Sequence, residues 1–274
     1  MSRLALRVSR ALGLVTVQDL GRRGRMHEGV PGGGALVPEL AARANRAAGN
    51  DDGAPLFEIM GALAIECDAR AIVATDDGAR RAIEPGERLT IASGAARVAY
   101  LAVAGGLDVP EVLGGRGALV CAGLGVVARA GDVVHACAPA HDARVVAQRP
   151  EPWRASGPVR VIPGPDLEAF APDALAVLCG AEWTVSASSD RVGTRLEGPT
   201  LARAAGWVDR TAPMARGAIE VPPSGAPIVL GPEHPTTGGY PLLAVVARAD
   251  LGRLLATPLG GRVRFVTFAP TDPT

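Results

Sequence analysis

The chain has 274 residues, more than a typical single domain, so we expect two domains or one enlarged β domain. Its 28 basic side chains balance its 28 acidic ones, which leaves no single-signed field to hold nucleic acid or an anionic membrane surface. All of these basic residues are Arg, because the sequence contains no Lys. A Schiff-base lysine, a P-loop lysine and a covalently attached biotin are therefore excluded on this chain.

Strands are predicted along the whole chain by short apolar or alternating runs bounded by Gly and Pro. These runs occupy residues 4–8, 14–17, 71–74, 98–104, 159–162 and 263–268. Helical patterns are few. One helix is predicted from Pro38 to Ala48, with Pro at its first position and Gly49 after its end. A shorter helix is predicted at 251–256 with Asp250 as its cap. The predicted fold class is mainly β with a few short helices.

A Pro-rich stretch at residues 148–158 interrupts all periodicity and is the best candidate for a linker. It divides the chain into an N-terminal β-rich domain, 1–150, and a C-terminal domain, 158–274. The two parts have similar sizes and turn densities, which favours two packed β-barrel-like units.

The expected compartment follows from the lack of a secretory signal, a membrane span and paired Cys in the sequence. Residues 1–10 are too charged for a secretory signal, and no window approaches the ~18 consecutive apolar residues of a membrane span. The four Cys are scattered without a Cys-x-x-Cys pair, which favours reduced thiols. We therefore expect a cytoplasmic protein without membrane contact.

The first segment dense in polar residues is 16–58. Arg22 follows a predicted strand and lies between two Gly, so it could direct a bidentate donor at a ligand; the alternative is a solvated charge at a strand end. Glu58 interrupts an apolar run and needs a partner such as Arg22 if it turns inward. Asn45 could present its amide to a cleft or to solvent. The Gly-rich stretch 29–34 could hold a carboxylate or phosphate at the start of the following helix, although such stretches are more often plain loops.

Two further polar segments lie in the second half of the chain. Arg191 and Arg195 fall in a stretch that Gly and Pro keep from being helical, so we expect a loop presenting both guanidinium groups to a small anion, or else a surface salt-bridge cluster. After a predicted hairpin, Thr236, Thr237 and Tyr240 offer hydrogen-bonding groups, which a plain turn would explain almost as well. No His-Glu-x-x-His spacing or Gly-x-Ser-x-Gly motif occurs, so we expect neither a metal site nor a serine hydrolase.

Taken together, these segments resemble the family that includes the C-type subunit of 5-oxoprolinase, Kip A and the second component of allophanate hydrolase, which is also described as biotin-dependent carboxyltransferase-like. The matching stretches are residues 16–22 (Thr-Val-Gln-Asp-Leu-Gly-Arg), 29–31 (Gly-Val-Pro), 44–50, 101–106, 189–199, 221–225 and 236–241 (Thr-Thr-Gly-Gly-Tyr-Pro). Their order and spacing extend over nearly the whole chain.

The resemblance implies a cyclophilin-like β-barrel architecture and a composite site shared with a partner of related fold. That partner would be the B-type subunit of 5-oxoprolinase, which is Kip I-like, and an A-type subunit would complete the heteromeric complex. The complex would open 5-oxo-L-proline, a small-molecule substrate, to L-glutamate, with ATP shared with the partner and no biotin on this chain. From motif position and chemistry, we expect catalytic roles for Arg191, Arg195 and Glu58 and substrate-binding roles for Arg22, Asn45, Thr236, Thr237 and Tyr240.

The sequence departs from the family pattern in three places. Residues 34–37 lack an acidic group, residues 233–235 read Glu-His-Pro where the family commonly has Asp-Arg-Gln, and residues 114–124 lack the usual Ser, Thr and Phe. Two other functions therefore stay open: a carboxyltransferase half of a urea carboxylase or allophanate hydrolase-type system, and a non-catalytic regulatory binding protein like Kip A.

Overall fold

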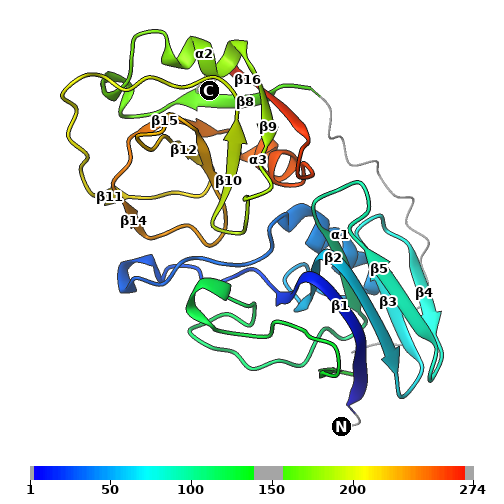
Figure 1. Cartoon of the computed structure of the whole chain (residues 1–274). Coiled ribbons are helices and arrows are strands. Elements are labelled where there is room, and N and C mark those ends of the chain that lie inside the picture. The colour runs from blue at the N-terminus through cyan, green and yellow to red at the C-terminus, as the bar shows by residue number, and fades with distance from the viewer. Residues whose placement is uncertain (1–2, 139–156, 269–274) are drawn as a thin grey trace, which may run out of the picture. The chain divides into compact units, whose positions relative to one another are not determined.

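The computed structural model describes residues 3–138 and 157–268, and these form two compact units (Figure 1). Unit 1 contains the described residues of 1–25 and 32–153, and unit 2 contains those of 26–31 and 154–274. The short segment 26–31 thus belongs with the second half of the chain. The predicted linker at 148–158 lies almost wholly outside the described residues, so the predicted domain limits of 150 and 158 stay predictions.

The described chain is mainly β with three α-helices, as the sequence predicts. Unit 1 holds a seven-stranded sheet with the order β4-β3-β6-β2-β1-β7, in which β5 also pairs with β2. Its strands and helix are β1 (Leu4–Gln18), α1 (Pro38–Ala48), β2 (Leu56–Cys67), β3 (Ala71–Thr75), β4 (Arg80–Ile83), β5 (Arg88–Ala92), β6 (Ala99–Val103) and β7 (Val133–Ala136).

Strands β1 and β2 are the longest in unit 1 and pair antiparallel along almost their whole length. The predicted runs 4–8 and 14–17 are both part of β1, because the strand continues through Gly13. Gly13 lies opposite Gly61, and a Cβ on Gly13 would come within 2.2 Å of the Met60 carbonyl oxygen. Only Gly fits this close approach of two backbones. The inward side chains of both strands form the core with their neighbours; buried members include Leu6, Val8, Val17, Phe57, Ile59 and Leu63.

Helix α1 has the predicted limits, Pro38–Ala48. Pro38 supplies a backbone angle suited to the first turn, and Gly49 ends the helix in the left-handed conformation at φ 83°. Its apolar face packs on β3 and β6. Leu40, Ala41 and Ala44 are buried there, which fixes the helix on the sheet.

Unit 2 holds a closed barrel (Figure 1). Its strand order is β10-β13-β12-β15-β8-β16-β9. Its elements are β8 (Val159–Pro163), α2 (Ala174–Gly180), β9 (Glu182–Val185), β10 (Gly193–Glu197), β12 (Ala218–Glu220), β13 (Ile228–Leu230), β15 (Leu242–Val246), α3 (Arg248–Leu255) and β16 (Arg262–Thr267). A separate pair, β11 (Ala212–Pro213) and β14 (Thr237–Gly238), lies outside the barrel. Closure pairs every barrel strand on both edges, which removes exposed sheet edges.

The predicted hairpin is confirmed as the antiparallel pair β12 and β13, but the predicted helix cap is wrong. Helix α3 begins at Arg248 after Ala247, so Asp250 lies inside its first turn. The Asp250 carboxylate accepts hydrogen bonds from the backbone N–H and from Nε of Arg160 on β8, at 2.9 and 2.8 Å. These bonds hold the Asp250 pKa below its ordinary value. Asp250 therefore ties α3 to the barrel wall.

Candidate functional site

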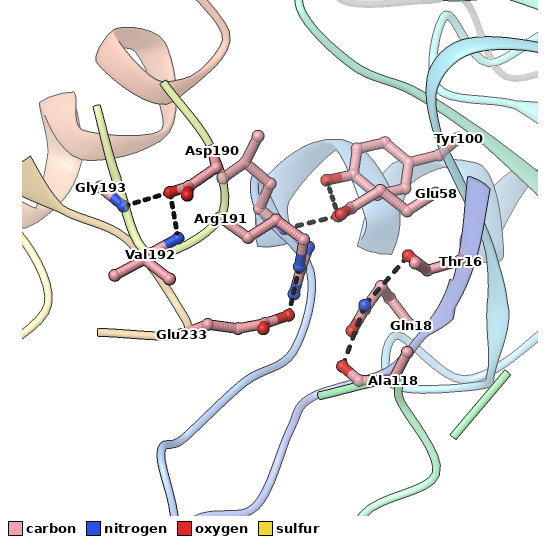
Figure 2. Close-up of polar contacts among 11 residues, drawn as sticks. Thr16, Gln18, Glu58, Tyr100, Ala118, Asp190, Arg191, Val192, Gly193 and Glu233 are labelled. Carbon is pink, nitrogen blue, oxygen red and sulfur yellow. Dashed lines mark hydrogen bonds and ion pairs between the residues drawn. The ribbon is translucent and has the colours of Figure 1, made fainter. Parts of the chain in front are cut away.

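Glu58 turns inward from β2 and is 1% exposed. Its Oε2 accepts hydrogen bonds from the Leu36 backbone N–H at 2.6 Å and from the Tyr100 hydroxyl at 2.8 Å. The same hydroxyl accepts a bond from the Val37 N–H (Figure 2 shows the pair Glu58 and Tyr100). Both amides immediately precede α1, so an internal carboxylate occupies the position where the Gly-rich stretch was expected to hold a ligand anion.

Arg22 is also buried, at 1% exposure. Its Nε donates to the Val112 carbonyl at 3.0 Å, and its Nη1 and Nη2 have no hydrogen-bond partner among the described residues. The expected pairing of Arg22 with Glu58 is therefore not formed. The structure instead buries Nη1 and Nη2 of this guanidinium without an acceptor in the described part of the chain.

Asn45 is buried in α1, and its amide bonds within the chain. Nδ2 donates to the carbonyls of Asp52 and Ala54 at 3.2 and 2.8 Å, and Oδ1 accepts from Asn50 at 3.2 Å. Both amide hydrogens thus hold the loop after the helix. Asn45 supports the fold of this loop, and its predicted part in substrate binding stays a prediction.

In unit 2, Arg191 lies in the loop between β9 and β10 and forms a buried ion pair with Glu233 (Figure 2). Nε of Arg191 lies 2.6 Å from Oε1 of Glu233, and the side chains are 2% and 1% exposed. Asp190 shapes the loop by accepting from the backbone N–H groups of Val192 and Gly193 at 2.8 and 3.0 Å. The guanidinium of Arg191 therefore has a fixed orientation.

The structure separates the two predicted guanidinium groups of unit 2. Arg195 lies on strand β10 rather than in a loop, and its side chain is exposed. Burial raises the pKa of Glu220, and the charge of Arg195 opposes that larger effect. Arg191 and Arg195 thus do not form the paired loop that is one of the two arrangements expected from the sequence.

Thr236, Thr237 and Tyr240 lie at the surface of unit 2, and Tyr240 is 40% exposed. Thr237 belongs to β14 and pairs with Pro213 of β11, while the Thr236 carbonyl accepts a bond from the Met214 N–H at 3.0 Å. The backbones of Thr236 and Thr237 are held in place, and the exposed side chains of Thr237 and Tyr240 are accessible to a substrate or a partner.

Three residues outside the predicted set help to build these sites: Gln18, Glu233 and His234. Gln18 is 0% exposed and belongs to the 16–22 motif, which was the available signal. His234 is 4% exposed, and its Nδ1 lies 2.7 Å from the Pro235 carbonyl, which only a donor can bond. Burial is the main cause of its lowered pKa. His234 is therefore neutral near pH 7, with its proton on Nδ1.

One pocket of about 400 Å³ lies in unit 1. Its wall is formed by residues 19–21 and 114–116 with Arg23, Gly53, Pro55 and Glu111. Across the described ranges, no group of three or more His, Cys, Asp or Glu is placed to hold a metal ion. No helix in the described part of the chain is long and apolar enough to span a membrane.

The structure is a β-rich fold with one closed barrel and a separate large sheet. Each of the two carries buried Arg and Glu side chains. The chain belongs to the family described as carboxyltransferase domain, subdomain A and B, whose model matches residues 28–267.

Individual relatives agree with this assignment. The chain is 33% identical over 285 residues to the C-type subunit of 5-oxoprolinase from Escherichia coli (strain K12), covering 95% of this chain and 90% of that protein. The crystal structure of TTHA0988 in space group P212121 matches with a TM-score of 0.82 and 31% identity, over 96% of this chain and 55% of that one. The urea amidolyase of K. lactis matches with a TM-score of 0.85 and 23% identity, over 97% and 19%, which shows the fold alone.

Proposed function

We propose that this chain is the C-type subunit of an ATP-dependent 5-oxoprolinase, which opens 5-oxo-L-proline to L-glutamate together with subunits of the B and A types. The main support is the 33% identity to the C-type subunit from Escherichia coli, which extends over 90% of that protein. Identity over nearly the full length favours a shared role more than a match confined to one motif would. The complex with partner subunits is part of the proposal.

In this proposal Arg191 stabilises negative charge that develops on the substrate. Its orientation is set by Glu233 before a substrate arrives, so little reorganisation is needed when charge appears. Arg195 assists from the exposed face of β10, and Glu58 keeps its predicted catalytic role. Substrate binding is assigned to Arg22, Asn45, Thr236, Thr237 and Tyr240.

This chain does not form, in its described residues, the lysine-based phosphate contacts of a nucleotide site. It has no Lys to contact phosphates, and the start of α1, which could accept a phosphate, already holds Glu58. We therefore assign ATP handling to the partner subunits and derive no step through ATP here. Biotin cannot be attached to this chain, because that linkage needs a Lys.

The test is co-expression of the chain with its B-type and A-type partners, followed by measurement of ATP-dependent glutamate release from 5-oxo-L-proline. We expect release only when all three subunits are present. An intact complex that releases no glutamate would overturn the proposal and leave a Kip A-like binding role. Arg191→Ala should abolish most of the release, whereas Arg264→Ala, which removes an exposed Arg bonded to Glu182, should not.

A second candidate is carboxyl transfer, which the family description favours. It would be tested by adding a carboxybiotin-bearing carrier protein and following labelled carboxylate to a small acceptor amide. Label transfer without glutamate release would favour this candidate over the oxoprolinase.

A further inference from the structure

Arg22 is one of the largest fully buried side chains in the described chain, yet two of its three guanidinium nitrogens have no partner there. Burying a guanidinium while two of its nitrogens lack acceptors is unfavourable, so its retention needs a compensating contact. Nη1 and Nη2 form one edge of the planar group. That edge matches the two oxygens of a carboxylate.

Hydrogen bonds and close packing fix the position of the Arg22 backbone and side chain. Its backbone N–H donates to the Gly32 carbonyl at 2.6 Å, and its Nε donates to the Val112 carbonyl at 3.0 Å. A Cβ on Gly115 would lie 2.8 Å from Cγ of Arg22, so only Gly leaves room for the arm. Val112 and Gly115 close a tight turn in which Leu113 adopts a positive φ of 55°. A non-Gly residue in that conformation indicates backbone strain, which commonly accompanies binding sites.

Gln18 lies four residues earlier, and it has a buried acceptor that lacks a donor within the described chain. Its Nε2 donates to the Thr16 hydroxyl at 3.0 Å and to the Ala118 carbonyl at 3.2 Å (Figure 2). A carbonyl can only accept, so the amide nitrogen must face Ala118 and the other atom must be the oxygen. That oxygen, Oε1, is buried and has no partner among the described residues. It can bond only to a donor.

Both side chains lie against the same short segment. Cγ of Arg22 lies beside Gly115, and Oε1 of Gln18 lies 2.8 Å from the position that a Cβ on Gly117 would take. Gly115 and Gly117 are two residues apart, so their Cα atoms lie within about 7 Å of each other. Both side chains therefore border the segment 115–117.

We infer that Arg22 and Gln18 form a subsite for a small molecule that carries a carboxylate close to an amide N–H. Nη1 and Nη2 of Arg22 bind its carboxylate, and Oε1 of Gln18 accepts a hydrogen bond from its amide N–H. The inference deepens the proposed function and rests on it for the choice of 5-oxo-L-proline as the natural ligand. The subsite itself requires only a carboxylate close to an N–H group.

The experiment measures ligand affinity by calorimetry on the complete complex. Three probes separate the two contacts: 5-oxo-L-proline, 2-pyrrolidinone, which lacks the carboxylate, and 5-oxotetrahydrofuran-2-carboxylate, which has a ring oxygen in place of the N–H. Arg22→Met should weaken the binding of 5-oxo-L-proline by on the order of 30- to 100-fold and leave the affinity for 2-pyrrolidinone unchanged. Gln18→Met should weaken the binding of 5-oxo-L-proline but not that of the lactone, 5-oxotetrahydrofuran-2-carboxylate.

Equal affinity of the folded Arg22→Met variant and the parent for 5-oxo-L-proline would overturn the carboxylate contact. An equal loss for lactam and lactone in Gln18→Met would overturn the N–H contact. If Arg22→Met fails to fold, Arg22→Lys keeps the charge without the planar edge, and an intermediate affinity is expected; unchanged affinity would again overturn the assignment.

A different measurement separates this inference from the proposed function. If the parent complex neither binds nor converts 5-oxo-L-proline, the proposed function is overturned. N-acetylglycine, which carries a carboxylate close to an amide N–H, then serves as the probe of the subsite. The subsite predicts that N-acetylglycine raises the melting temperature of the parent chain but not that of Arg22→Met or Arg22→Lys. No shift in the parent would overturn the subsite as well.

Discussion

Nε of Arg191 donates a 2.6 Å hydrogen bond to Oε1 of Glu233, and both side chains are almost completely shielded from solvent. The two loops are also joined through their backbones, because the Glu233 N–H donates to the Arg191 carbonyl at 3.1 Å. The pair therefore links the loop before β10 to the loop after β13. Removal of either charge would leave the other buried without its opposite charge at this distance.

Glu233→Leu is expected to lower the free energy of unfolding by about 3–5 kcal/mol, because it removes the carboxylate that balances the buried Arg191. The double variant Arg191→Met, Glu233→Leu should recover most of that loss. Guanidinium denaturation of the purified chain measures both. Glu182→Leu, which removes a surface carboxylate, is the control and should change stability by no more than about 1 kcal/mol. Similar losses for Glu233→Leu and Glu182→Leu would contradict the prediction.

Tyr100→Phe removes the hydroxyl that joins Glu58 to the start of α1. We expect a loss of about 1–3 kcal/mol in stability, because a buried amide and a buried carboxylate each lose a partner. Amide hydrogen exchange at Leu36 and Val37 should accelerate. Glu39→Gln alters an exposed acidic residue in the same first turn and is the matched control. Its effect should stay below about 1 kcal/mol.

Glu58→Gln separates support of the fold from chemistry, because the amide oxygen can still accept from Leu36. If Glu58 is catalytic, kcat of the active complex should fall far more than the folded fraction does. A variant that loses stability and kcat in the same proportion would indicate a structural residue instead.

The buried His234 should make stability depend on pH. Its pKa is lowered chiefly by burial, so the unfolded chain takes up a proton at higher pH than the folded chain does. The free energy of unfolding should therefore decrease as pH falls below about 6.5, and the loss should stop below the folded-state pKa. His234→Gln should remove this slope.

Denaturant midpoints between about pH 5 and pH 8 provide the measurement. Glu220, whose pKa is raised by burial, contributes a slope of opposite sign, so the difference between parent and variant is the relevant quantity. His27→Gln changes an exposed His and serves as the control. Parallel pH profiles for the parent and His234→Gln would show that the prediction is wrong.

Asn45→Ala should destabilise the chain by about 1–3 kcal/mol, because the carbonyls of Asp52 and Ala54 lose their donor. Asp51→Ala, at an exposed neighbouring position, is the control. If Asn45 instead binds substrate, KM of the active complex should rise more than the melting temperature falls. Thermal unfolding and steady-state kinetics on the same samples distinguish the two.

Local signals were sufficient for much of the fold. Pro38 and Gly49 mark the ends of α1 directly, since each residue has one suitable place at a helix terminus. The strand at 71–74 and the hairpin of β12 and β13 follow from alternation and turn residues. The single strand through Gly13 was not predicted, because the reason for that Gly lies in Gly61 on another strand.

The sequence by itself determined the family, the mainly β class and the absence of lysine chemistry, because composition and ordered motifs carry that information. Only the tertiary structure decided which charges meet. It paired Arg191 with Glu233, placed Glu58 at the start of α1 and buried Arg22 against the Val112 carbonyl, and each outcome depends on residues 20 or more positions apart in the chain. Hydrogen bonds act over about 3 Å in space, and no spacing along the chain reports that distance.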